Sequence, residues 1–228
     1  MITTAAEEIL ATTFETYPRV ALVASFQAES GVLIDMVTRL GIRPDVLTID
    51  TGRLPAETLA VIDEFRSRYD INLRVLSPDP GEVRQLIAVH GADLFRESIE
   101  LRRSCCDVRK VRPVGRALRE YDAWVTGLRR DQSATRASTP TLAIDDAHGG
   151  ILKVAPLASW TRADVEDYLV RNSVPRHPLY ALGYTSIGCA PCTRATTAGE
   201  DERAGRWWWE QESNKECGLH VPAAQEVE

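Results

Sequence analysis

The sequence lacks any apolar run long enough to cross a bilayer, and its first stretch, "MITTAAEEILATTFETY", is mixed and acidic. We therefore expect no transmembrane helix and no secretory signal peptide, and we interpret the chain as a soluble, cytoplasmic protein. It also lacks a basic surplus, because 27 Lys and Arg stand against 33 Asp and Glu, for a formal net charge of −6. General nucleic-acid binding usually needs the opposite balance, so we expect no nucleic-acid partner.

No internal repeat or low-complexity linker interrupts the 228 residues, a length that suits one domain with a sizeable core. The first half alternates apolar runs typical of buried strands with amphipathic helical stretches, and this pattern predicts parallel strands joined by crossover helices. A further helical stretch ends near residue 121. We expect strands within 19–26, 45–51, 71–78, 122–128 and 151–160, and helices within 5–17, 31–41, 55–70, 81–91 and 161–173.

Polar residues follow the first two expected strands, and ligands of open parallel sheets bind beyond such strand ends. The first strand runs into "SFQAESG" at 25–31, which lacks the Gly spacing and the Lys of a Walker A loop. Ser25, Ser30 and the free N–H groups of a helix start suit an anion, although an ordinary capped helix is the alternative. The second strand ends in residues that suit a nucleoside or form only a turn: Asp50, Thr51 and Gly52.

Three arginines follow the strand expected at 122–128, in "GLRRDQSATR". A guanidinium binds phosphate or sulfate through two parallel hydrogen bonds. In an acidic protein, Arg129, Arg130 and Arg136 at one strand end favour recognition of a dense anion, a solvated charged turn being the alternative. Two anion-suited loops at strand ends together favour a nucleotide as the ligand.

The five cysteines fall into three groups. Cys105 and Cys106 are adjacent, Cys189 and Cys192 form a C-x-x-C, and Cys217 stands alone in a polar tail. A reducing compartment disfavours structural disulfides, whereas four thiolates suit Zn²⁺ or an iron–sulfur cluster. The contiguous first pair argues mildly against a zinc ribbon and requires a constrained backbone. A redox dithiol at "CAPC" is a weaker alternative, because that motif lies late in a Gly/Pro-rich loop.

The first cysteine pair lies in the strongly basic stretch "RRSCCDVRKVRP". Its positive charges would favour thiolates and would offset a negatively charged cluster and an anionic substrate beside it. The alternative is a solvated basic helix face that carries two inert cysteines. The basic residues of this stretch are Arg102, Arg103, Arg109, Lys110 and Arg112.

Six stretches, taken in this order, resemble the assimilatory adenylyl-sulfate and phosphoadenylyl-sulfate reductases: "SFQAESGVLIDM", "IDTGRLPAET", "RRSCCDVRKVRP", "GLRRDQSATR", "GCAPCTRATTAGEDERAGRWWWE" and "KECGLH". They extend from about residue 20 to 220. The resemblance implies an α/β fold with a doubly wound, mostly parallel sheet, of the adenine nucleotide α-hydrolase-like (PP-loop) type. It implies a single domain with a core at about 18–140, a cluster-binding, loop-rich extension at 141–210 and a flexible catalytic tail at 211–228.

The resemblance also implies roles for individual residues. Cys217 would attack the sulfur of the activated sulfate, AMP would leave, and thioredoxin or a similar dithiol would release sulfite from the S-sulfocysteine. Lys110 would lie between cluster and substrate, and His220 would lower the pKa of the Cys217 thiol. A [4Fe–4S] cluster with an electrostatic and structural role would bind Cys105, Cys106, Cys189 and Cys192. The substrate would contact Ser25, Phe26, Gln27, Ser30, Asp50, Thr51, Gly52, Arg129, Arg130, Arg136, Arg203 and Arg206.

The four paired cysteines favour adenylyl sulfate as the substrate, because the branch of the family without them uses the 3′-phosphorylated nucleotide, which stays the alternative. A PP-loop ATP pyrophosphatase is a further alternative, but "SFQAES" lacks the Gly pair and the Asp of its S-G-G-x-D-S loop. A zinc-bound binding module without chemistry is another. The sequence leaves open whether the chain forms a homo-oligomer.

Overall fold

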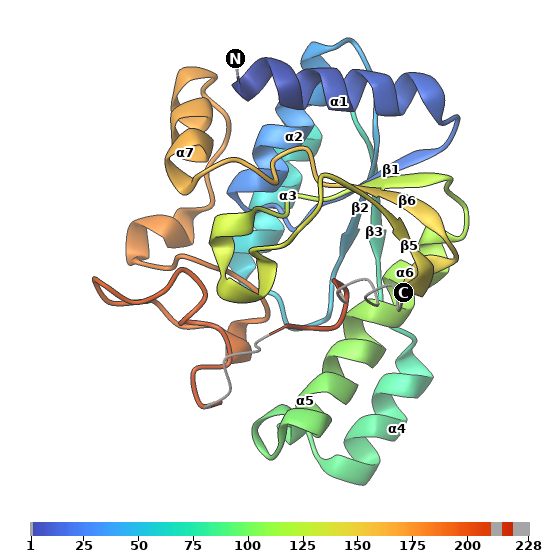
Figure 1. Ribbon diagram of the computed structural model, residues 1–228. Coiled ribbons are helices and arrows are strands. Elements are labelled where there is room, and N and C mark those ends of the chain that lie inside the picture. Colours follow the sequence, from blue (N-terminus) through green and yellow to red (C-terminus); the bar gives the residue numbers. More distant parts are fainter. Residues whose placement is uncertain (1, 211–215, 221–228) are drawn as a thin grey trace, which may run out of the picture.

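A twisted sheet of short apolar strands forms the centre of the fold (Figure 1). The computed structural model describes residues 2–210 and 216–220, and within them the sheet has six strands in the order β3-β2-β1-β4-β6-β5. Neighbouring strands pair in parallel except at the β5 edge, where β5 and β6 are antiparallel. The strands are β1 (Val20–Val23), β2 (Asp45–Ile49), β3 (Asn72–Leu76), β4 (Ala123–Val125), β5 (Leu142–Asp145) and β6 (Ile151–Val154).

Helices cover both faces of this sheet, as the doubly wound prediction requires. One apolar cluster joins the strands to α1, α2, α3 and α7, and a second joins them to α6. Figure 1 shows α2, α3 and α7 on one side of the strands and α4, α5 and α6 on the other. The helices are α1 (Ile2–Thr16), α2 (Ala28–Arg39), α3 (Ala56–Arg68), α4 (Pro80–His90), α5 (Ile99–Cys106), α6 (Arg112–Leu118) and α7 (Arg162–Arg171).

Short helical turns occupy several of the loops that connect the strands and helices (Figure 1). They are η1 (Leu94–Arg96), η3 (Arg130–Gln132), η4 (Ala134–Arg136), η5 (Asp146–His148), η6 (Pro178–Leu182) and η7 (Ala190–Cys192). A π-helical segment, η2 (Asp107–Val111), joins α5 to α6 without a break. π-helical turns inside α-helices occur frequently at functional sites.

Several local predictions are confirmed. The strands lie where the apolar runs predicted them, and the helix expected at 161–173 begins with a capping box. In that box the Asp164 N–H donates to Thr161 Oγ1 at 3.2 Å, and the Thr161 N–H donates to Asp164 Oδ2 at 2.8 Å. Strand β5 was not expected, and the strand expected at 151–160 ends at Val154. In the described ranges 2–210 and 216–220, no helix combines the length and the apolarity that a membrane span needs.

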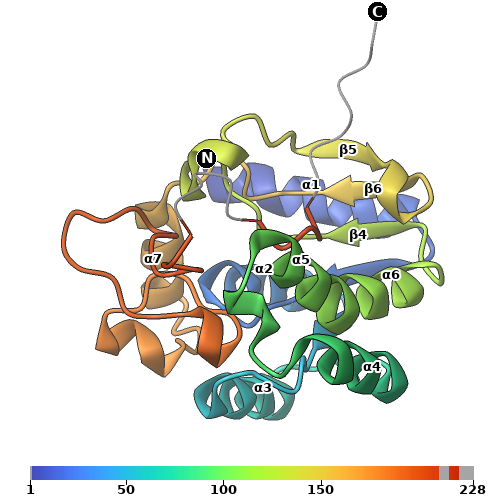
Figure 2. The same cartoon turned by 90° about the horizontal axis from the view of Figure 1, so that it is seen from below.

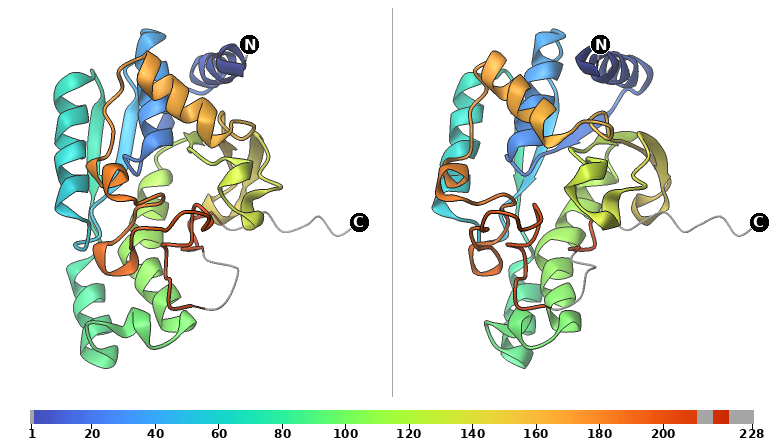
Figure 3. Two further views of the ribbon diagram at one scale, coloured as in Figure 1. Left: turned by 90° about the vertical axis from the view of Figure 1, so that its left-hand side faces the viewer. Right: turned by 60° about the vertical axis from the view of Figure 1, so that its left-hand side comes forward.

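Segments far apart in the sequence meet below the carboxyl ends of the strands. Both views in Figure 3 show the orange and red chain after α7 running back beside the green helix α5. In the view from below, most of the red chain lies around α7, and a short red stretch lies near α5 (Figure 2). This arrangement brings the two cysteine pairs to one place.

Candidate functional site

A cavity of about 180 Å³ opens where the order of the strands reverses. From β1 the chain proceeds outward through β2 and β3, whereas β4 lies on the other side of β1. Ligands of open α/β sheets bind at this switch point, beyond the carboxyl ends of the strands. The ends of β1, β2 and β4 each contribute to its wall, with Ser25, Thr51 and Gly127 among the lining residues.

The loop between β1 and α2 forms one wall of the cavity. The Ser25 N–H donates to Ser30 Oγ at 3.0 Å, and Gln27 Nε2 donates to Ser25 Oγ at 3.1 Å. Gln27 also accepts from the Ile187 N–H at 2.7 Å, which fastens the loop to the segment before the C-x-x-C. Ser25, Gln27 and Ser30 line the cavity, and their contact with an anion stays a prediction. Phe26 does not line it, because its ring packs edge-on against Phe65 in the core.

Both cysteine pairs line the same cavity, together with Cys217. Cys105 and Cys106 come from the last turn of α5, and Cys189 and Cys192 come from η7 and its N-cap. The π-helical segment η2 directly follows Cys106, so the helix changes its geometry immediately after the cysteine pair. Thr51 Oγ1 lies 3.2 Å from Cys189 Sγ, so the turn after β2 contacts the cysteine wall.

The described residues contain no set of three or more His, Cys, Asp or Glu side chains placed to hold a metal ion as they stand. The four paired thiols nevertheless share one apolar cluster with Trp207 and Phe95. Burial raises the pKa of Cys105 and Cys106, and it raises the pKa of Cys192 to about 12. Four soft donors around one buried volume match the chemistry of a four-thiolate group.

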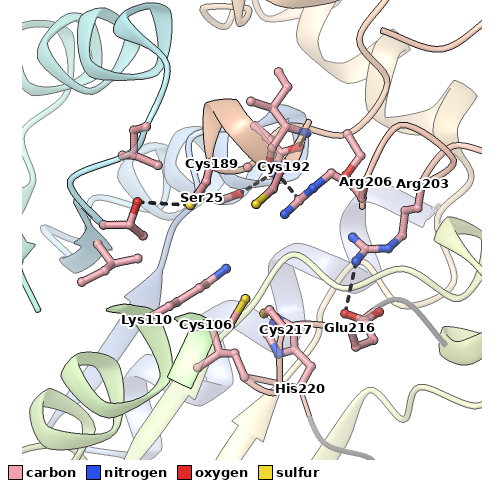
Figure 4. Close-up of a pocket in the computed structure, with 18 of the residues that line it drawn as sticks. Ser25, Cys106, Lys110, Cys189, Cys192, Arg203, Arg206, Glu216, Cys217 and His220 are labelled. Carbon is pink, nitrogen blue, oxygen red and sulfur yellow. Dashed lines mark hydrogen bonds and ion pairs between the residues drawn. The ribbon is translucent and has the colours of Figure 1, made fainter. Parts of the chain in front are cut away.

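Cys217 projects into the cavity beside Cys106 and faces Lys110 (Figure 4). Burial opposes ionisation of this thiol, but the Lys110 charge and the Leu219 N–H outweigh it, so the pKa of Cys217 is lowered. A thiolate is the nucleophilic form of cysteine, and a nearby cation favours it. Lys110 belongs to η2, so the same π-helical segment places the lysine next to the thiol.

His220 stacks on Trp124, with ring centroids 5.7 Å apart and an interplanar angle of 6°. Burial and the cations around it hold the pKa of His220 well below its usual range. The imidazole is therefore neutral at pH 7. The lowered pKa of the Cys217 thiol has Lys110, and not this imidazole, as its main cationic cause.

The arginines expected to contact substrate divide into two sets. Arg136, Arg203 and Arg206 line the cavity, whereas Arg129 and Arg130 are not among the described residues that line it. Arg206 lies over the Trp207 ring at 4.6 Å, and a Cβ at Gly188 would collide with its guanidinium. The absence of a side chain at Gly188 thus leaves room for this cation beside the C-x-x-C.

Arg129 is fully buried and engages carboxylates from three segments. It donates to Glu29 at 2.9 Å and to Glu202 at 3.0 and 2.9 Å, and it contacts Asp131. Arg130 is exposed and donates to the Thr139 carbonyl at 2.9 Å. Both positions therefore have protein partners, and their substrate role stays a prediction.

The residues predicted to bind substrate in the turn after β2 also divide into two sets. Thr51 lines the cavity, but Asp50 and Gly52 are not among its described lining residues. Asp50 Oδ1 accepts from the Gly52 N–H at 2.8 Å, and Gly52 has a φ of +71°, which favours glycine. These two residues shape the turn that presents Thr51, which matches the alternative given for them from the sequence.

Several cavity residues were not singled out as site residues from the sequence. Arg102 and Arg109 were noted only as charges near the cysteines, Glu216 only as part of the polar tail around Cys217, and Arg53 was not noted. Arg109 Nη1 donates to the Thr51 carbonyl at 2.8 Å, across the cavity from its own helix. A charged residue next to Cys217 was visible in "KECGLH", but no pattern indicated that one of its partners, Arg136, lies 80 residues away.

Comparison with known proteins gives one family and a consistent set of relatives. The family model for the phosphoadenosine phosphosulfate reductase domain matches residues 19–195. The adenosine 5′-phosphosulfate reductase of Burkholderia cepacia is 48% identical over 215 residues, which cover 94% of this chain and 86% of that protein. The enzyme of the same name from Allochromatium vinosum is 44% identical over 216 residues, covering 95% of this chain and 84% of the relative.

Solved structures give the same fold. The phosphoadenylyl-sulfate reductase of Candida auris, in a phosphate complex, superposes with a TM-score of 0.72 at 27% identity, covering 83% of this chain and 90% of that one. The FMN adenylyltransferase of Candida glabrata, with FMN and an ATP analogue, superposes with a TM-score of 0.59 at 17% identity, covering 87% and 67%. The second likeness concerns the fold alone, and both agree with the PP-loop type of sheet expected from the sequence.

Proposed function

Because the chain belongs to the phosphoadenosine phosphosulfate reductase domain family, we propose that it reduces adenosine 5′-phosphosulfate to sulfite and AMP through a covalent intermediate on Cys217. The observation that carries this proposal is the position of one thiol. Cys217 lies in the switch-point cavity, next to Lys110 and opposite the β1–α2 loop. The activity makes the protein an oxidoreductase acting on sulfur, as its relatives' names indicate.

In the first step the Cys217 thiolate attacks the sulfur of the sulfate group. A bond forms between Sγ and that sulfur, the bond from sulfur to the bridging phosphate oxygen breaks, and AMP leaves with the electron pair. Thiolate and substrate are both anionic, so cations are needed to offset their repulsion. Lys110 lies beside the thiol, and Arg206 lines the same cavity with no carboxylate partner among the described residues.

In the second step a dithiol protein such as thioredoxin regenerates the thiol. One of its thiolates attacks Cys217 Sγ, sulfite leaves, and the second thiol resolves the mixed disulfide, so that two electrons come from the dithiol. This step requires that Cys217 become accessible, and tail residues 211–215 and 221–228 lie outside the described residues. We propose that the single domain consists of a core at about 18–140, an extension at 141–210 and a catalytic tail at 211–228, as the resemblance to the family implies.

Adenosine 5′-phosphosulfate is the substrate we favour over its 3′-phosphorylated form. Relatives named for it are 42% to 49% identical to this chain, whereas the phosphoadenylyl-sulfate reductase from Candida auris is 27% identical. The chain also carries all four paired cysteines. The 3′-phosphorylated nucleotide is the second candidate, because the same chemistry applies to it.

We further propose that Cys105, Cys106, Cys189 and Cys192 hold a [4Fe–4S] cluster. The geometry that supports this is their common buried cavity, with the buried Trp207 Nε1 and Arg109 Nε lacking hydrogen-bond partners among the described residues. A bound cluster would supply a negatively charged, electron-rich group whose role here is electrostatic and structural. The residues of this chain would offset its charge, Lys110 and Arg109 foremost.

The thiols of the chain also indicate the compartment in which the protein works. Free thiols and a thiolate-bound cluster persist in a reducing compartment, so we place the protein in the cytoplasm, where sulfate assimilation supplies cysteine. We propose neither a membrane nor a nucleic acid as a partner.

The test is chemical and involves one position. Enzyme incubated with adenosine 5′-phosphosulfate and no reductant should gain the mass of SO₃ on the peptide that contains Cys217, and thioredoxin should then release sulfite. Cys217→Ser should gain no mass and release no sulfite, because it has no thiolate to attack the sulfur. Sulfite production by Cys217→Ser, or an unmodified Cys217 in active wild-type enzyme, would contradict the proposal.

A further inference from the structure

The residue before the candidate nucleophile has its own anchor (Figure 4). The Glu216 carboxylate accepts two hydrogen bonds from Arg136, at 2.8 and 2.9 Å, and lies 3.3 Å from Arg203 Nη2. We propose that Glu216 is a positioning residue, and that Arg136 and Arg203 form a clamp which holds Cys217 in the cavity. This inference deepens the proposed function and rests on it for its effect on rate.

The clamp is attached to the framework of the site. Arg136 Nη1 donates to Gln132 Oε1 at 2.6 Å, and Gln132 Nε2 donates to Glu29 Oε1 at 3.0 Å. Glu29 lies in the first turn of α2, directly after the β1–α2 loop. A chain of hydrogen bonds therefore links the tail carboxylate to the wall of the cavity that faces Cys217. Networks of this kind fix positions better than isolated pairs do.

The ion pairs of the clamp are shielded from water. The exposed fractions of the Arg136, Arg203 and Glu216 side chains are 12%, 13% and 15%. Screening by solvent is weaker for such pairs than for surface pairs, which contribute little. Removing the carboxylate leaves two guanidiniums close together without their shared counter-ion, so the closed tail should lose much of its stability.

A second contact holds the main chain of Glu216. Arg102 Nη1 donates to the Glu216 carbonyl at 2.5 Å, while its other nitrogens donate to Glu210 at 2.8 and 3.0 Å. Arg102 is fully buried and its guanidinium lies 4.4 Å from the centre of the Trp207 ring. One buried cation on α5 thus contacts both Glu210 and Glu216, and holds Glu216 at the start of the described tail segment 216–220.

The other side of Cys217 is fixed by apolar contacts. Leu219 is 4% exposed and packs with Val114 and Leu118 of α6, and His220 stacks on Trp124. Gly218, between Cys217 and Leu219, has a φ of +89°, so the chain turns sharply after the thiol. Cys217 is held between a charged anchor and an apolar anchor, and a nucleophile fixed on both sides can meet its target in a reactive geometry.

The cavity cations divide accordingly. Arg136 and Arg203 are matched by Glu216, whereas Lys110 and Arg206 have no carboxylate within ion-pair distance among residues 2–210 and 216–220. We therefore infer that Arg136 and Arg203, which also line the cavity, hold the tail when no nucleotide is bound, whereas Lys110 and Arg206 face the thiolate without such a partner. Direct contact of Arg136 and Arg203 with the substrate stays a prediction.

A test that does not depend on the substrate measures access to Cys217. Iron-loaded enzyme without nucleotide is treated with iodoacetamide, a neutral reagent, and alkylation of the Cys217 peptide is followed by mass spectrometry. Glu216→Gln should speed this alkylation by about tenfold or more, because local opening exposes the thiol. Arg136→Gln should also speed it, and the double variant should be no faster than Glu216→Gln alone, since Glu216→Gln already removes the contact with Arg136.

The matched control is Glu200→Gln, which removes a carboxylate from the exposed pair with Arg194 and should leave alkylation of Cys217 unchanged. In single turnover, Glu216→Gln should sulfonate Cys217 about 10- to 100-fold more slowly at saturating nucleotide, with unchanged nucleotide affinity. Wild-type alkylation rates in Glu216→Gln, or additive effects in the double variant, would overturn the clamp. Absence of SO₃ transfer in the wild type would instead refute the function, whatever the alkylation shows.

Discussion

The five thiols of this chain differ by environment more than by chemistry. Burial raises the pKa of Cys105, Cys106 and Cys192, whereas the Lys110 charge and a backbone N–H hold the pKa of Cys217 below its usual value. A group that is to act as a nucleophile must ionise before the substrate arrives, while metal ligands can lose their protons as the metal binds. The difference supports two separate roles for residues that line one cavity.

This separation predicts two different losses. Cys106→Ser should lose iron, the absorbance of the cluster and activity together, because one of four ligands is removed. Cys217→Ser should keep its iron and its absorbance but lose activity, since the nucleophile is not a ligand. Iron analysis and the visible spectrum of both purified variants distinguish the cases. A full iron content in Cys106→Ser would contradict the assignment of Cys106 as a ligand.

At the scale of elements, one buried histidine joins α3 to the segment after α7. His177 Nδ1 accepts from the Leu179 N–H at 3.3 Å, so its proton sits on Nε2 and is donated to Thr58 Oγ1 at 2.9 Å. The side chain is 2% exposed, and burial lowers its pKa from the ordinary 6.5, against a smaller opposing effect of Glu57. The folded protein therefore holds this ring neutral.

The pH dependence of stability follows from that shift. Below pH 6.5 the unfolded chain binds a proton at His177 that the folded chain refuses, so stability falls as the pH drops toward the folded pKa. The slope should reach at most about 1.4 kcal/mol per pH unit. His177→Gln should flatten urea-denaturation stabilities between pH 6.5 and 5, whereas His90→Gln, an exposed change in α4, should not. Equal slopes in wild type and His177→Gln would contradict this.

The elements themselves were largely predictable, because period and turn residues act locally. Apolar runs placed β1, β2 and β4, and the helical pattern within 161–173 placed α7. Strand β5 was missed because an edge strand buries little, and Leu142 and Ile144 are 54% and 57% exposed. The π-helical turn at Asp107–Val111 was also missed, since its residues continue an ordinary helical pattern and only tertiary packing selects the wider turn.

The types of residue that line the site were predictable from the sequence, but the contacts between their side chains were not. Cysteines, serines and arginines in fixed order indicated the cavity, and Ser25, Thr51 and Arg206 line it. The partner of Arg136 is Glu216, 80 residues away, and no local pattern specifies such a contact. The charged residues of a site can be listed from the sequence, but the ion pairs that they form depend on the packing of the whole chain.

At the scale of the molecule, Arg129 joins three distant segments by ion pairs. Its guanidinium contacts Glu29 of α2, Asp131 of η3 and Glu202 of the loop after the C-x-x-C. Gly127 makes room for this junction, because a Cβ there would lie 2.6 Å from the Glu29 Cβ. The β1–α2 loop, the arginine loop and the cysteine loop are thereby held in one arrangement by a single side chain.

Replacing Arg129 should therefore destabilise the entire fold rather than one loop. Arg129→Met leaves the buried Glu29 without its cation and leaves Glu202 only its longer ion pair with Arg162 at 3.6 Å, and breaking a buried pair costs about 3–5 kcal/mol of unfolding free energy. Arg130→Met, on the exposed neighbour, should change it by about 0.5 kcal/mol or less. Urea denaturation at pH 7 measures both. A cost for Arg129→Met no larger than for Arg130→Met would mean that the three segments hold together without their shared guanidinium.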